Sequence, residues 1–201
     1  MEILKDAKER LNEILEDANH LIGVKQEDIE TLKERKEILL SWADELMDDF
    51  YSTLLSYPKT AKVFEKIPVE QVKSKNKRWY EQLVSGEIDE KFYEFQFFVG
   101  LVHVYWKIDN DIMIFMANRL KMNFLRKASE SFPPEEAVKV FHSFSKLVDF
   151  LIALTVEGYI FILREALIDI AGFSPGLVDN MMRMKLEEIY EYYKNEFVKN
   201  S

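Results

Sequence analysis

Apolar residues recur at intervals of three and four along most of the chain, which is the spacing of one face of an α-helix. In residues 1–23 charged side chains fill the other positions, and Gly23 ends the pattern. The apolar stripe of this segment consists of Ile3, Leu4, Ala7, Leu11, Ile14, Leu15 and Ala18. We therefore expect an amphipathic helix over residues 1–23, as an N-terminal addition to the main domain.

A second helical stretch follows, and a proline limits its length. The pattern resumes near Gln26, leaves room for a bend near Lys36 and stops at Pro58, because a proline disfavours helix in the residue before it. Residues 59–66 are interpreted as a short connection to the next helix.

Prolines and short polar side chains mark the starts of the later helices, since a proline suits the first helical turn and an aspartate or asparagine can cap it. The expected starts are Pro68, Asp89, Asp109 or Asn110, Glu135 and Pro175. Ser85-Gly86 separates two of these helices. No strand-like alternation is present, so about eight helices predict an all-α fold, with a main domain at residues 24–172 and a C-terminal helix at 173–201.

The composition is that of a folded helical protein without nucleic-acid or membrane partners. With 201 residues the chain can form one domain with a substantial core, and only 6 glycines and 5 prolines leave little material for hairpins. The net charge of −9 argues against nucleic acid, which requires a basic face. Charged residues interrupt the most apolar region, 147–173, and no apolar leader opens the chain, so we expect a cytoplasmic protein that does not enter a membrane.

Several kinds of chemistry are excluded by the residues that are missing. The chain has no cysteine, which rules out disulfides, thiolate metal ligands and cysteine nucleophiles. The HExxH, Walker A and GxGxxG patterns do not occur. A ferritin-like di-iron site needs two Glu-x-x-His pairs, and the nearest match, Asp17-x-x-His20, occurs once. No catalytic motif is found, so an enzyme is not expected.

Of the three histidines, His103 has the most distinctive surroundings. His20 fits a surface residue, and His142 fits a partly buried packing residue. His103 lies among aromatic and aliphatic side chains, three positions after Gly100. Such a histidine can be a core residue or a haem ligand, and the local context leaves both interpretations open. A ligand would need a partner for its other ring nitrogen, and the carbonyl of Val99, one helical turn earlier, is the candidate.

Four segments of the chain form a set of motifs in a fixed order. They are Asp49–Pro58 with the sequence DFYSTLLSYP, Phe64, Arg78–Asp89 with its Ser-Gly turn, and Val99-Gly100-Leu101-Val102-His103. Together these motifs resemble the sensor-globin lineage, which comprises the globin domains of globin-coupled sensors and, more distantly, the protoglobins. The separation of 52 residues between Tyr51 and His103 is similar to that of the lineage. The resemblance spans residues 26–165 and implies a globin-like fold with an extra helix at each end.

The resemblance also implies a haem site. His103 would be the proximal iron ligand, and the hydroxyl of Tyr51 would donate a hydrogen bond to bound dioxygen. Lys75 would reach solvent or a haem propionate, and Lys75 or Asn76 would be the distal donor if Tyr51 only packs. The implied cofactor-binding residues are Phe50, Tyr51, Phe64, Val72, Lys75, Asn76, Val99 and Met113. Because no Cys-x-x-Cys-His motif exists, the cofactor would be haem b, held without covalent bonds.

Three alternative functions follow from the resemblance. The protein would be a haem-based sensor of a diatomic gas (dioxygen, CO or NO), a haem globin that binds or scavenges oxygen without signalling, or a haem-free helical interaction module. It carries no kinase, cyclase or methyl-accepting segment, so a signal is expected to pass to a separate partner. The helices at 109–128 and 135–170 carry more apolar surface than one core hides, which predicts a homodimer.

Overall fold

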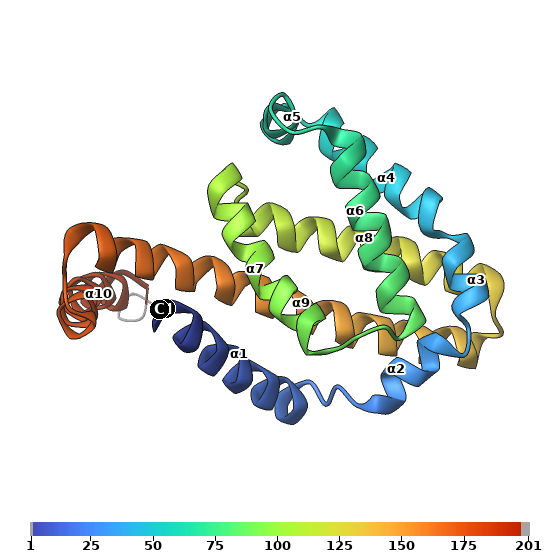
Figure 1. The fold of residues 1–201 in the computed structure, drawn as a ribbon, viewed down its shortest axis with the longest axis horizontal. Helices are drawn as coiled ribbons and strands as arrows, with labels where there is room; N and C mark the ends of the chain where they lie inside the picture. The colour runs from blue at the N-terminus through green and yellow to red at the C-terminus, as the bar shows by residue number, and fades with distance from the viewer. Residues whose placement is uncertain (1, 198–201) are drawn as a thin grey trace. The chain divides into compact units, whose positions relative to one another are not determined.

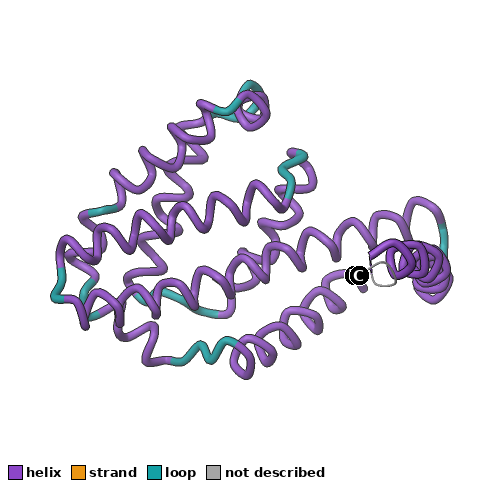
Figure 2. The backbone as a smooth tube through the Cα atoms, turned by 180° about the vertical axis from the view of Figure 1, so that it is seen from behind, coloured by secondary structure: helices purple, strands orange, loops and turns teal. Residues whose placement is uncertain are grey.

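A computed structural model describes residues 2–197, and every regular element in them is an α-helix (Figure 1). The connections between the helices are short, as the teal segments of Figure 2 show. The helices are α1 (Glu2–Leu21), α2 (Gln26–Lys33), α3 (Lys36–Ser41), α4 (Ala43–Ser56), α5 (Pro58–Phe64), α6 (Val69–Ser85), α7 (Glu90–Trp106), α8 (Asn110–Ser131), α9 (Pro134–Ala171) and α10 (Pro175–Phe197). None of the helices in this described range combines the length and apolar character that a membrane span requires. The predicted all-α fold is confirmed.

The chain divides after Ile160 into two compact units. The first unit holds α1 to α8 and most of α9, and the second holds the end of α9 and α10. Within the second unit, the guanidinium of Arg164 donates to the carboxylate of Asp179 over 3.1 Å. The backbone N–H of Leu177 donates to the hydroxyl of Ser174 over 3.3 Å, so this serine caps α10.

The region from Gln26 to Pro58 contains three helices, α2, α3 and α4, where the sequence predicts one bent stretch. Pro58 then opens α5, because its fixed φ and missing N–H suit the first turn of a helix. The hydroxyl of Thr60 donates to the carbonyl of Tyr57 over 3.0 Å and closes that turn. The prediction that residues 59–66 form only a short connection is therefore wrong for residues 59–64, which lie in α5.

Capping residues set the ends of α6 and α7, and two of them match the sequence-based prediction. Gly86 ends α6 with a φ of 70°, a conformation that favours glycine. Asp89 precedes α7, and its carboxylate accepts a backbone N–H of the first helical turn over 2.8 Å. Lys107 ends α7 with a φ of 56°. The turn after it is closed by a hydrogen bond of 2.8 Å from the N–H of Ile108 to the carbonyl of His103.

Aromatic rings form much of the core of the first unit. Phe124 of α8 stacks on Phe144 of α9 with ring centroids 3.7 Å apart. Tyr80 of α6 is fully buried and donates its hydroxyl proton to the carbonyl of Leu39 over 2.8 Å. Helix α4 packs against α5, α6 and α8. These contacts bury large rings while satisfying the polar group of the tyrosine, which is how aromatic side chains stabilise a core.

Helix α7 crosses α9 at a point where both backbones carry a glycine (Figure 1). A Cβ atom at Gly100 would lie 2.4 Å from the carbonyl oxygen of Thr155. A Cβ atom at Gly158 would lie 2.0 Å from the carbonyl oxygen of Phe97. Neither position can hold a larger residue unless a backbone moves. The crossing fixes α7, and His103 lies three residues beyond it.

Gly158→Ala is expected to destabilise the protein, because the new methyl group would overlap the backbone of α7. Overpacking of this kind lowers the free energy of unfolding by about 1–3 kcal/mol. Urea unfolding followed by circular dichroism measures the change. Gly176→Ala is the control, since its Cβ would meet nothing within 4 Å, and alanine there should be neutral or stabilise by up to about 1 kcal/mol. Equal effects of the two substitutions would contradict a tight crossing.

Candidate functional site

Tyr51 of α4 is 3% exposed and holds its hydroxyl next to α6. The phenol oxygen accepts a hydrogen bond of 2.7 Å from Nδ2 of Asn76. Because the oxygen is the acceptor in this bond, the hydroxyl proton is available for a second one. The rings of Phe50 and Phe64 pack beside Tyr51, with centroids 5.4 and 5.9 Å from its ring. Burial raises the pKa of Tyr51, so the phenol stays protonated.

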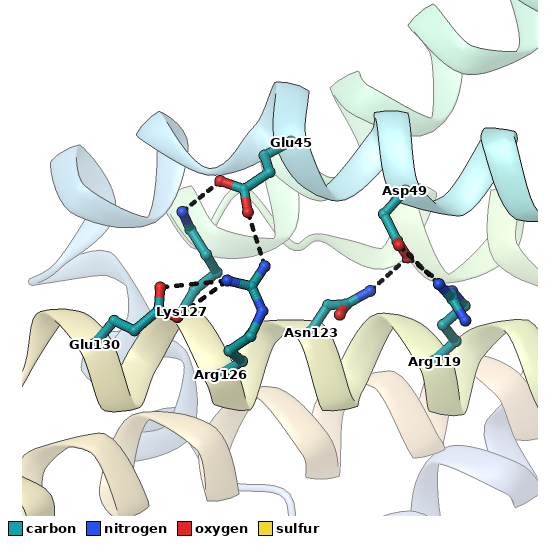
Figure 3. A network of polar contacts seen from close by, with 7 residues as sticks. All are labelled: Glu45, Asp49, Arg119, Asn123, Arg126, Lys127 and Glu130. Carbon is teal, nitrogen blue, oxygen red and sulfur yellow. Dashed lines mark hydrogen bonds and ion pairs between the residues drawn. The ribbon is translucent and has the colours of Figure 1, made fainter.

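A network of polar contacts joins α4 to α8 and fixes the helix that carries Tyr51 (Figure 3). Two residues before Tyr51, the carboxylate of Asp49 accepts two hydrogen bonds from the guanidinium of Arg119, at 2.7 and 2.8 Å. Asn123 donates to the same carboxylate. The hydrogen bond from Arg119 holds the pKa of Asp49 below its usual range, so the carboxylate is charged at neutral pH. One turn earlier on α4, Glu45 pairs with two further basic side chains of α8.

His103 of α7 is neutral, because burial lowers the pKa of its imidazole to about 4. The neutral imidazole is the form that binds a metal. Its Nδ1 atom is buried and has no hydrogen-bond partner among the described residues. No hydrogen bond joins the ring to the carbonyl of Val99, so this acceptor stays a prediction for a metal-bound His103.

The other predicted cofactor contacts are distributed over three helices. Val72 and Asn76 are half-buried and share one face of α6, since they are four residues apart. Val99 of α7 and Met113 of α8 are also half-buried, whereas Lys75 of α6 is exposed. The hydrogen bond and the ring contacts of Tyr51 join residues of α4, α5 and α6, and these contacts do not reach α7. The roles of all these residues toward a cofactor stay predictions.

Two further residues have buried polar atoms without a partner among the described residues, and the sequence does not single them out as site residues. The atoms are Nε1 of Trp79 and Oδ1 of Asn110. The sequence indicates a capping role for Asn110, and no local motif marks either atom as unpaired. A buried polar atom without a partner costs about 1–3 kcal/mol, so both positions are candidates for a functional role.

His142 is exposed, where the sequence predicts a partly buried packing residue. The core face of α9 passes through Val140 and Ser143, which turns His142 away from the core. It lies at a polar depression of about 370 Å³ between α2 and α9. The buried carboxylate of Asp28 in this depression accepts hydrogen bonds from Ser143 at 3.0 Å and from Lys146 at 3.2 Å. Because that carboxylate is already paired, the depression is not a candidate for the functional site.

The buried, neutral imidazole of His103 fits the protein ligand that haem iron requires. Among the described residues, no group of three or more His, Cys, Asp or Glu side chains could hold a bare metal ion. The porphyrin supplies four nitrogen ligands to haem iron, so one neutral histidine such as His103 is enough from the protein. Tyr51 and Asn76 offer the polar donors that a small gas ligand requires.

The architecture of the first unit is that of a globin. The globin domain of a globin-coupled sensor from Geobacter sulfurreducens has this fold, with a TM-score of 0.66 and 22% sequence identity, over 72% of this chain and 96% of that chain. The family model described as Protoglobin matches residues 11–163, and the chain belongs to the protoglobin family. No match was found among the curated proteins. The predicted globin fold and lineage are therefore confirmed.

Proposed function

We propose that this member of the protoglobin family binds haem b through His103 and senses a diatomic gas. The observation that carries the proposal is the buried, neutral imidazole of His103, whose Nδ1 atom makes no hydrogen bond to the described residues. An imidazole must be unprotonated to bind a metal, and burial keeps this one so. The solved domain with the same fold is described as part of a globin-coupled sensor, which supports sensing over oxygen storage.

Different residues of the chain would bind the iron, donate to the gas and exclude water. When bound, haem would supply an iron atom that takes a diatomic gas as a ligand. Nε2 of His103 would hold the iron, and the hydroxyl of Tyr51 would donate a hydrogen bond to the gas. Nδ2 of Asn76 already bonds to that hydroxyl and would keep it in position. Phe64 and Val72 would exclude water, which strengthens the hydrogen bond from Tyr51.

A signalling role needs a surface for a separate partner, and α10 supports such a role. It lies beyond residues 11–163, which match the family. Leu177, Met181 and Met184 are exposed apolar residues of α10, and Met184 is 70% exposed. Exposed apolar surface of this kind is typical of an interaction site. The cytoplasmic location that the sequence indicates stays a prediction.

We also propose a homodimer formed by α8 and α9. The buried residues Met116, Leu120 and Phe124 face the core, and the opposite face of α8 carries Phe115 and Met122. Phe115 is 67% exposed. A twofold axis beside α8 would pair this apolar face with its copy in a second chain.

Phe115→Glu is expected to convert the dimer into a monomer, because two charges would meet across the twofold axis. Analytical ultracentrifugation at micromolar concentration measures the change in mass. Phe95→Glu is the matched control, since Phe95 is an exposed aromatic residue of α7 outside the proposed interface. A wild-type protein that sediments as a monomer with haem bound would refute the dimer.

His103→Ala is expected to abolish stable haem binding, because the substitution removes the proposed protein ligand of the iron. The wild-type protein should bind one haem per chain and show a Soret band. His142→Ala is the control, since His142 is exposed and lies away from the site. An unchanged Soret band and haem affinity in His103→Ala would show that this histidine is only a core residue.

Tyr51→Phe is expected to speed dioxygen release about five- to tenfold, which corresponds to a net hydrogen bond of about 1–1.5 kcal/mol. Release of CO should change little, because bound CO carries less negative charge on its outer atom. Flash photolysis and stopped-flow mixing measure both rates, with the exposed Tyr57→Phe as control. If both gases leave Tyr51→Phe at wild-type rates, Tyr51 only packs, and Lys75 and Asn76 become the donors to test.

A further inference from the structure

Two of the three unpartnered buried atoms in the described residues are chemically complementary. They are Nδ1 of His103 and Oδ1 of Asn110. When a metal binds Nε2 of a neutral imidazole, the proton must be on Nδ1, which then acts as a donor. Iron binding would therefore make His103 a buried donor that needs an acceptor. The structure already holds a buried acceptor that lacks a donor.

The turn between α7 and α8 places these two residues at adjoining helix ends. The N–H of Ile108 donates to the carbonyl of His103 over 2.8 Å and folds the connection back on the last turn of α7. Asp109 pairs with Lys59 over 2.7 Å, which anchors the start of α8. Asn110 follows as the first residue of α8 and begins its inner face. That face continues through Met113, Ala117, Leu120 and Phe124.

We propose that Asn110 accepts the hydrogen bond from Nδ1–H of His103 when haem is bound, and so acts as a positioning residue for the iron ligand. The proposal rests on the proposed function, because only metal binding at Nε2 confines the proton to Nδ1. An acceptor from α8 would fix the plane of the imidazole and increase its basicity, which strengthens its bond to the iron.

Three substitutions test this role in the haem-loaded protein. Asn110→Leu removes the acceptor at similar volume, and Asn110→Asp supplies a charged, stronger acceptor of the same shape. Asp111→Asn changes an exposed neighbour and is the matched control. The measurement is the iron–histidine stretching frequency of the ferrous, gas-free protein, obtained by resonance Raman spectroscopy at pH 8.

Asn110→Leu is expected to lower the stretching frequency, Asn110→Asp to raise it, and the control to leave it unchanged. Asn110→Leu should also lose haem to excess apomyoglobin about tenfold faster, the usual scale for loss of a partner of a metal-binding histidine. Shifts of opposite sign would not arise from a purely structural role. If both variants keep the wild-type frequency, or move it in the same direction, the proposal is overturned.

Three further outcomes complete the test, and the last two separate this proposal from the one on which it rests. If Asn110→Leu does not fold, Asn110→Asp decides alone, because a higher frequency supports the proposal and an unchanged frequency overturns it. If the wild-type protein forms no Soret band with haem, haem binding itself is refuted, and the role of Asn110 with it. If the wild-type protein binds haem and the Asn110 variants keep its iron–histidine stretching frequency, only the proposed role of Asn110 is refuted.

Discussion

The backbones of α7 and α9 meet at Gly100 and Gly158, where neither helix has room for a Cβ atom. This contact holds α7 at a fixed distance from α9. Beside it, Nε2 of Gln96 donates to the hydroxyl of Thr155 over 2.6 Å, which opposes rotation of α7 about its own axis. His103 is carried by this immobilised helix. Its burial, its neutral imidazole and its unpartnered Nδ1 atom all depend on where the crossing places α7.

The helix that carries Tyr51 is held by a different kind of force. Asp49 and Arg119 join α4 to α8 by paired hydrogen bonds, and Asn76 bonds the tyrosine hydroxyl from α6. Each of these bonds contributes about 1 kcal/mol, which is at the low end of the cost of overpacking at the crossing. In the proposed function the iron ligand is therefore set by rigid packing. The group that contacts the gas is set by weaker bonds that can adjust when a ligand enters.

The all-α fold was predictable because the spacing of apolar residues is a local property of the chain. The caps at Gly86 and Asp89 were predictable for the same reason. The role of Pro58 as the first residue of α5 was not predictable, since a proline can follow the end of one helix or begin the next. The packing of α5 decides between these two roles. The resemblance supplied His103 as a site candidate. The unpaired oxygen of Asn110 depends on which atoms the fold brings near it, and no sequence pattern carries that information.

The ion pairs between α4 and α8 lie on the surface, where dissolved ions can reach them. At about 0.1 M salt the screening length is about 10 Å, and exposed ion pairs weaken further as the salt concentration rises. The crossing at Gly100 and Gly158 involves no charge, so added salt leaves it unchanged. Osmotic stress that raises the ion content of the surrounding solution would thus weaken the ion pairs that hold α4, the helix of Tyr51. The crossing that positions the helix of His103 would not change.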